Sequence, residues 1–98
     1  MYRGTTPTLT FYLPLDPTTL TTCYITFTQD NEVVLEKTLN DCQMGTDNLS
    51  FTLSQKETLA FRSDSTVCIQ VRCKINQMAL ASQIMYTNIC DILKEGEI

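Results

Sequence analysis

The segment Thr66–Ile75, TVCIQVRCKI, has the most regular pattern in this chain. Apolar residues occupy every second position from Val67 to Ile75, and polar residues such as Arg72 and Lys74 stand between them. Successive side chains of a β-strand point to opposite faces, so the pattern predicts a strand with one face in a core. Such strands are typical of antiparallel sheets. The flanking sequence must therefore supply partner strands.

The same period of two recurs in shorter runs on both sides of this segment. We expect Phe27 and Val71 to be buried on facing strands, and we expect Val33 and Leu35 to share one face. The polar residues Gln29–Glu32 predict a turn that joins two runs in a hairpin. The predicted strands are Thr8–Leu13, Cys23–Thr28, Val33–Thr38, Leu49–Leu53, Thr66–Ile75 and Ala81–Ile89.

One segment breaks this pattern in a way that predicts a helix. Ser54 is followed three residues later by Glu57, which is the spacing of a helix capping box. We therefore expect one short helical turn, which brings Leu59 or Phe61 under the sheet.

Prolines and loops delimit the predicted strands. Pro7 and Pro14 bracket Thr8–Leu13. Because proline cannot complete the hydrogen-bond ladder of a central strand, this first strand is expected at a sheet edge. A loop is expected over residues 40–48.

The strand number and spacing predict an all-β fold for residues 1–98. We expect a single immunoglobulin-like antiparallel β-sandwich of about six or seven short strands with one short helical turn. A small β-barrel is the main alternative. Residues 1–7 have no evident role in the core and are expected to form a mobile arm. Residues 90–98 form a charged tail.

The composition is that of a folded and mildly acidic protein. Seven Lys and Arg against eleven Asp and Glu give a formal net charge of −4. This balance argues against nucleic-acid binding, because cationic side chains supply most of the affinity for phosphates. No apolar run approaches the roughly 18 residues that a membrane span needs, and no secretory signal is recognisable. We therefore expect a cytoplasmic product without membrane contact.

Residue types that carry most catalytic chemistry are missing or scattered. The chain has no histidine, which removes the commonest general base and a frequent zinc ligand. Glycine-rich phosphate loops, nucleophile elbows and calcium loops are not present either. A carboxylate pair is the remaining option, but the acidic residues fall mostly in predicted turns and helix starts. We expect no enzymatic activity, no cofactor and no metal site.

The five cysteines are expected to be free thiols. Their number is odd, and no two show the CxxC spacing of zinc or redox sites. Cys23, Cys68 and Cys73 lie within predicted strands, where cysteine acts as a small apolar residue. The remaining two are Cys42 and Cys90.

Outward-facing tyrosines and basic residues mark a candidate contact surface. Tyr12 and Tyr24 fall on outward positions of strands that we expect to be neighbours, so one interpretation is a cross-strand pair on a solvated sheet. Tyrosine is also enriched at protein interfaces, and Arg72 and Lys74 lie on the outer face of the longest strand. The alternative interpretation is therefore a protein-binding patch.

Most of the chain resembles a known group of proteins, through the segments MYRGTTPTLTFYLP, CYITFTQDNEVVLEKTLNDC, LSFTLSQKETLAF and IQVRCKINQMALAS. These segments resemble those of small proteins encoded among the virion-structure genes of phages and prophages of gut Firmicutes. The chain is also similar to the N-terminal immunoglobulin-like module of phage baseplate upper proteins. The matching residues are Arg3, Gly4, Thr5, Thr6 and Pro7 in the opening, Leu53, Ser54, Gln55, Glu57, Thr58 and Leu59 in the turn, and Ile69, Gln70 and Arg72 in the late strand.

The resemblance implies a β-sandwich subunit of a phage tail, baseplate, connector or capsid decoration. Such a subunit has no catalytic residues, is made in the host cytoplasm and is carried in the virion. Its partners are other virion proteins or further copies of itself. The candidate protein-binding residues are Arg3, Gly4, Thr5, Thr6, Pro7, Tyr12, Tyr24 and Arg72.

Functions of other classes remain open at this point. A phage-encoded inhibitor that binds and blocks a host defence protein is one, because an acidic surface can mimic nucleic acid. The acidic residues are spread over loops and do not line one strand, which favours the structural role. A small-ligand carrier would need a pocket, for which the sequence has no signal.

Overall fold

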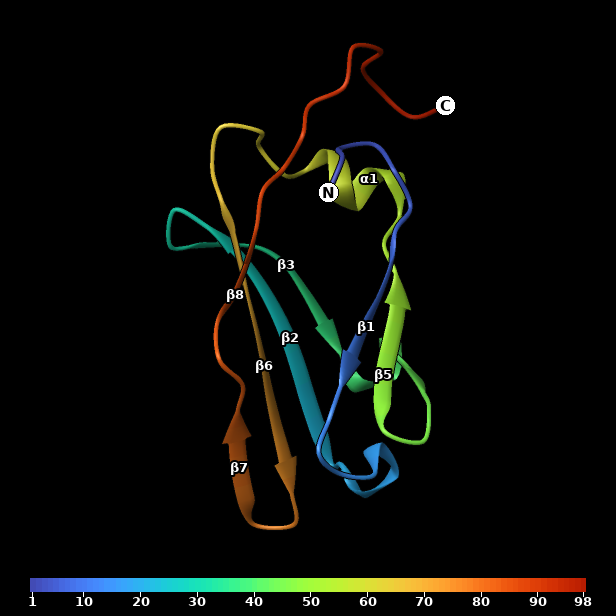
Figure 1. Ribbon diagram of the computed structural model, residues 1–98, viewed down its shortest axis with the longest axis vertical. Coiled ribbons are helices and arrows are strands. Elements are labelled where there is room, and N and C mark those ends of the chain that lie inside the picture. Colours follow the sequence, from blue (N-terminus) through green and yellow to red (C-terminus); the bar gives the residue numbers. More distant parts are fainter.

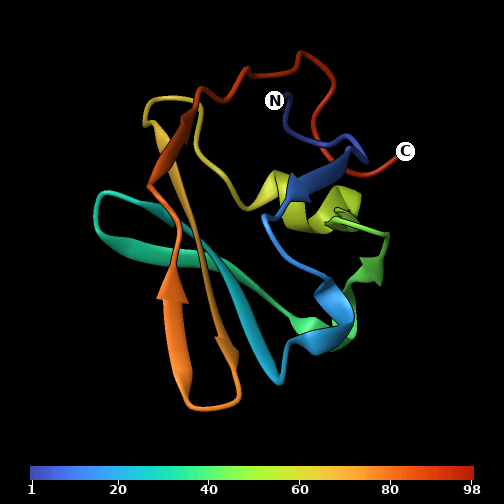
Figure 2. The ribbon, with the colours of Figure 1, turned by 60° about the horizontal axis from the view of Figure 1, so that its bottom comes forward.

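The computed structural model describes residues 1–98 as two antiparallel β-sheets packed into a sandwich (Figures 1 and 2). One sheet has the order β1-β5-β4 and consists of β1 (Thr8–Tyr12), β5 (Asn48–Thr52) and β4 (Gln43–Met44). The other has the order β3-β2-β6-β7, with β8 also paired to β6, and consists of β3 (Glu32–Thr38), β2 (Thr22–Gln29), β6 (Val67–Ile75), β7 (Met78–Ala81) and β8 (Met85–Thr87). The predicted all-β sandwich is confirmed, and its two separate sheets do not close into a barrel.

Short helical segments connect the strands: η1 (Pro17–Thr19), η2 (Leu39–Asp41) and α1 (Gln55–Leu59). The predicted capping box is present at α1. The Ser54 hydroxyl accepts a hydrogen bond from the Glu57 N–H at 3.1 Å, and Glu57 Oε1 accepts one from the Ser54 N–H at 2.9 Å. Beyond the helix, Phe61 is buried in the core, as expected.

The core is built around Phe27. Its ring centroid lies 6.2 Å from that of Phe51 and 5.9 Å from that of Phe61. The predicted burial of Phe27 and Val71 is confirmed, although their strands are neighbours in one sheet and do not face each other. A fully buried large apolar side chain contributes about 1.5–3 kcal/mol, so this cluster is a main source of stability.

The β2–β3 hairpin turn follows the prediction. Its central residues, Asp30 and Asn31, have φ angles of 51° and 65°. Positive φ at both positions is typical of the type I′ turn, whose twist matches that of the flanking strands.

The pairing within this hairpin contains a β-bulge. Thr28 pairs with Val33 but Phe27 pairs with Leu35, so Val34 is an extra residue. The bulge places Val33 on the outer face and leaves Leu35 packed against the core. The prediction that Val33 and Leu35 share a face is therefore wrong.

Two other segments differ from their predictions. The predicted last strand, Ala81–Ile89, is divided into the end of β7 and the whole of β8, because the chain bulges at Ser82. The Ser82 hydroxyl accepts a hydrogen bond from the Val71 N–H at 3.0 Å and so replaces a regular ladder bond. The predicted loop over residues 40–48 contains the end of η2 and the short strand β4.

Residues 1–7 are hydrogen-bonded to the rest of the domain, in contrast to the mobile arm expected from the sequence. Tyr2 and Cys90 form a parallel bridge, in which the Arg3 N–H donates to the Cys90 carbonyl oxygen at 3.0 Å. This bridge places the N-terminal segment beside the segment that follows β8. The backbone groups of that segment would otherwise lack a strand partner.

The same N-terminal residues also fix α1 to β5. The Thr58 hydroxyl donates a hydrogen bond to the Thr5 carbonyl oxygen at 2.8 Å, and the Leu53 N–H donates to the Pro7 carbonyl oxygen at 2.9 Å. The N-terminal segment, residues 1–7, therefore has a structural role.

Candidate protein-binding groove

The sandwich is open along the side where β1 faces β7 and β8. The Tyr2–Cys90 bridge closes the upper end of this side. Below the bridge, β1 pairs with β5, whereas β7 and β8 remain paired with β6 (Figure 1). No strand joins β1 to β7 or β8. The gap between these edges is lined by residues from both sheets.

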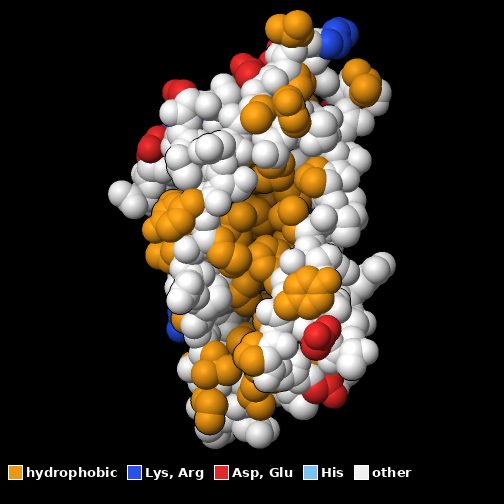
Figure 3. Space-filling view, viewed as in Figure 1, with side chains coloured by type: hydrophobic (Ala, Val, Ile, Leu, Met, Phe, Trp, Pro, Cys, Tyr) orange, Lys and Arg blue, Asp and Glu red, His pale blue; other side chains and the backbone are white.

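This opening is an apolar groove with a volume of about 450 Å³. Phe11 and Leu13 line it from one sheet, and Val71, Leu80 and Met85 line it from the other. Figure 3 shows the hollow as a continuous apolar band between the sheets. Nine of the twelve lining residues are hydrophobic and none is charged, so the groove is suited to an apolar occupant.

One side of the β1 backbone is unpaired. The Leu13 N–H, just after the strand, donates to the Asp47 carbonyl oxygen at 2.7 Å. In an antiparallel pair, residues that bond the neighbouring strand alternate with residues that point away from it. The backbone N–H of Leu13 points to β5. By this alternation, the backbone N–H and C=O groups of Thr10 and Tyr12 point to the open side.

The two strands beside the groove, β1 and β7, carry no charge and no proline, which are two of the features that usually prevent edge-to-edge association. Natural sheets protect free edges with charges, bulges, prolines or very short strands. β3 carries Glu32, Glu36 and Lys37 and contains a bulge, and β4 has only two residues. β1 (TLTFY) and β7 (MALA) contain neither charge nor proline. The uncharged edges are therefore the ones that flank the groove.

The inner face of β7 is incompletely covered. Leu80 lies opposite Cys73 and Met78 lies opposite Ile75, so both side chains point to the inner face of their sheet. Leu80 is nevertheless 37% exposed and Met78 is 62% exposed. Exposed apolar residues gathered on one surface mark a site of interaction with another molecule.

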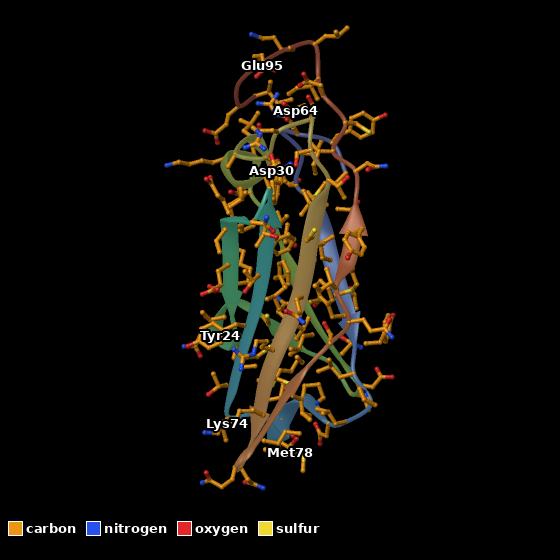
Figure 4. The ribbon with its side chains drawn as sticks, turned by 90° about the vertical axis from the view of Figure 1, so that its left-hand side faces the viewer. Tyr24, Asp30, Asp64, Lys74, Met78 and Glu95 are labelled. Atoms are coloured by element: carbon orange, nitrogen blue, oxygen red, sulfur yellow. The ribbon has the colours of Figure 1, made fainter.

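The structure separates the two tyrosines that were expected on neighbouring strands. Tyr12 lies on β1 and lines the groove, whereas Tyr24 lies on β2 in the other sheet. They form neither the expected cross-strand pair nor a common patch. Tyr24 lies opposite Arg72 on the outer face of its sheet. In Figure 4, Tyr24 and Lys74 lie toward the lower end of that sheet, while Asp30, Asp64 and Glu95 lie at the upper end.

Arg3 is engaged within the domain. Its Nη1 atom donates to Asp91 at 2.7 Å and to Glu95 at 2.8 Å, and its side chain is only 17% exposed. Hydrogen bonds from the Ile92 N–H and from Arg3 hold the pKa of Asp91 below its usual range. Arg3 is therefore a structural residue in this conformation, and its guanidinium is already occupied.

The other candidate residues of the N-terminal segment divide into structural and exposed ones. Gly4 has a φ of 70°, and a Cβ atom there would lie 2.9 Å from Ile92 Cδ1. The Pro7 carbonyl oxygen accepts a backbone hydrogen bond, as described above. Thr5 and Thr6 are exposed, although the Thr5 hydroxyl donates to the Tyr2 carbonyl oxygen.

The thiols near the groove are protonated at neutral pH. All five cysteines are free in the structure. Cys73 lines the groove, and Cys23 lies directly opposite it on β2. Burial raises the pKa of Cys73 and raises the pKa of Cys23 to about 11, with smaller contributions from Cys42 and Cys73 to the latter. No group of three Cys, Asp or Glu side chains is arranged to hold a metal ion.

Sequence reasoning did not identify the β7 side of the groove. The predicted strand Ala81–Ile89 includes Ala81 and Met85, but no strand is predicted over Met78 and Leu80. The available signal is the run Met78–Ile84, which contains no charged residue. The longest helix, α1, has five residues, so none has the length or apolar character for a membrane crossing.

The architecture alone does not assign a function, since β-sandwiches serve many unrelated functions. The groove and its strand edges are therefore the features from which a function has to be inferred. No family model, no curated protein and no solved structure matches this chain.

Proposed function

We propose that the chain is a non-enzymatic protein-binding module and that the groove between β1 and β7 is its binding face. The observation that carries this proposal is an uncharged apolar groove flanked by two strand edges without charge or proline. The apolar side chains offer contact area whose burial favours association. The free edge of β1 offers N–H and C=O groups that an added strand can pair with.

The resemblance to small proteins of virion-structure genes suggests the setting, which is a tail, baseplate, connector or capsid-decoration subunit of a phage particle. Part of that resemblance rests on the opening around Arg3 and Gly4. In this structure these residues hold the N-terminal segment in place, which leaves the groove as the surface for assembly.

Mass spectrometry of purified phage particles, produced with variants of the gene, tests both parts of the proposal. Leu80→Glu places a carboxylate in the groove. Ala79→Glu places the same charge on the outer face of the same strand, one residue away, and serves as the matched control. We expect the wild-type and Ala79→Glu proteins in particles. We expect the Leu80→Glu protein to be folded by circular dichroism but missing from particles.

Each other outcome has a defined meaning. A wild-type protein that is missing from particles contradicts the structural role, and its recovery with a host defence protein would favour the inhibitor. Equal incorporation of the two variants would move the binding face away from the groove.

A further inference from the structure

We infer that the partner strand at β1 is β1 of a second copy of this chain, paired antiparallel about a two-fold axis at Thr10. This inference rests on the proposed function, because it assigns an occupant to the same binding face.

The free side of β1 is self-complementary in its hydrogen bonding. Thr8, Thr10 and Tyr12 direct their backbone groups away from β5, because Leu13 directs its N–H to Asp47 on the β5 side. With a two-fold axis at Thr10, this residue faces its own copy, and Thr8 faces Tyr12 of the second copy. Every outward-directed residue then meets another outward-directed residue, which is the arrangement of a hydrogen-bonded antiparallel pair.

The side chains match in the same register. On the inner face, Leu9 of one copy meets Phe11 of the other. On the outer face, Thr10 meets Thr10 and Thr8 meets Tyr12. Apolar pairs, Thr–Thr pairs and pairs of an aromatic with a β-branched residue all stabilise neighbouring strands. Tyr12 is 74% exposed in a single copy, so its side chain is available for such a contact.

The charge distribution permits two copies to meet at β1. Each chain has a formal net charge of −4, so association requires an interface that keeps the acidic residues apart. Neither β1 nor the groove contains a charged residue. At the edge of β3, the charges of Glu32, Glu36 and Lys37 and the bulge oppose pairing. Of the edges β1 and β3, β1 therefore allows the closer approach of two copies.

The same axis places the two grooves against each other. The groove lies on the open side of β1, which is the side where the second strand is added. The exposed parts of Leu80 then face an apolar surface of the second copy instead of water. A two-fold contact of this kind uses the same residues on both copies and closes as a dimer.

Sedimentation equilibrium of two charge variants tests the position of the axis. Thr10→Lys and Thr10→Glu each place two like charges opposite one another at the axis, whereas their mixture places Lys opposite Glu. We expect the wild-type protein to be dimeric and each variant alone to have a dissociation constant raised about tenfold or more. An equimolar mixture of the two variants should recover the mass of a dimer.

Thr10→Pro tests the backbone pairing separately. The Thr10 N–H points away from β5, so proline at this edge position in both copies removes the two hydrogen bonds of the Thr10–Thr10 pair and none of the β1–β5 ladder. We expect an unchanged circular dichroism spectrum and a monomeric protein.

Three results would overturn the inference: a wild-type protein that is monomeric at every concentration, a dimer that none of the Thr10 variants weakens, or a variant mixture no heavier than its components. The proposed function is tested apart from this by particle incorporation. If the wild-type protein is monomeric but Leu80→Glu still fails to enter particles while Ala79→Glu enters them, the groove binds a different virion protein.

Discussion

The Nε atom of Arg3 donates a hydrogen bond to the backbone carbonyl oxygen of Phe61 at 2.9 Å. The same guanidinium binds Asp91 and Glu95, so one side chain connects the start of the chain, the residue that leads out of α1 and the segment after β8. The N-terminal segment is thereby held against the residue whose ring lies in the core.

Replacement of Arg3 with methionine keeps the aliphatic part of the side chain and removes these hydrogen bonds. We expect the free energy of unfolding to fall by about 1–3 kcal/mol, because hydrogen bonds to charged groups are strong and the Phe61 carbonyl loses a partner. Urea denaturation measures the change. Thr6→Met, at an exposed position of the same segment, is the control and should leave stability unchanged. Deletion of residues 1–7 should also destabilise the domain; a truncated protein that melts like the wild type would show these contacts to be dispensable.

Gln29 is buried and fully hydrogen-bonded, so its replacement should be costly. Its Nε2 atom donates to the carbonyl oxygens of Arg62 at 2.7 Å and Ser65 at 2.9 Å, and its Oε1 atom accepts from the Arg62 N–H at 2.9 Å. Gln29→Met preserves the approximate volume but leaves these groups without their partner. Each unsatisfied buried group costs about 1–3 kcal/mol, so we expect a large drop in thermal stability. Gln77→Met, in the exposed β6–β7 turn, is the control; equal melting of the two variants would contradict the prediction.

The ion pair between Lys37 and Glu57 should make stability depend on pH in the acidic range. The Lys37 Nζ atom lies 2.5 Å from Glu57 Oε2, and both side chains are largely covered. Partial burial by itself raises the pKa of Glu57, but hydrogen bonds from Lys37 and from the Ser54 N–H outweigh it and leave the pKa below its usual range. A pKa that is lower in the folded state stabilises the protein above the unfolded value of about 4.3.

This stabilisation is lost as the pH falls through the lowered pKa of Glu57, because the folded state must then take up a proton that the unfolded state binds more readily. Glu57→Gln should therefore reduce the decrease in melting temperature between neutral and acidic pH. Glu97→Gln removes the same charge from an exposed position and serves as the control. A melting temperature that falls equally steeply in both variants would show that the ion pair does not contribute.

The thiols are expected to differ strongly in reactivity and to form no disulfide. Cys90 is exposed, whereas Cys23 is buried and its pKa is raised to about 11 by burial first of all. A thiol-specific reagent at neutral pH should modify Cys90 quickly and Cys23 only after unfolding. Reductant should not change the melting temperature. A decrease of more than about 4 °C, near the effect of losing 1 kcal/mol in a domain of this size, would indicate a structural disulfide.

The strands were predictable because their signal is local. Val67 to Ile75 alternate in one continuous run, and the Ser54–Glu57 capping box lies within four residues. The errors arise where the partner strand decides the outcome. The bulge that places Val33 outside depends on its register with β2. No local pattern specifies that register.

The groove was not predictable for a related reason. Tyr12 was identified as exposed from its own strand, but its position opposite β7 depends on which sheet each strand joins. That assignment brings together residues about 60 or more positions apart, such as Phe11 and Leu80, and leaves no trace in spacing or composition. Gln29 had a usable signal, since it continues the inward series that ends at Phe27.

The Tyr2–Cys90 bridge has a consequence for the order in which the domain is made. The ribosome releases residue 2 long before residue 90, so the bridge and the Arg3 contacts to Asp91 and Glu95 cannot form during most of synthesis. Until then, the segment that leads into β1 lacks the contacts that hold it against the rest of the domain. Contacts between residues so distant in the chain also slow folding. The incomplete chain is therefore most vulnerable to association with neighbouring chains on a polysome before the residues after β8 have emerged from the ribosome.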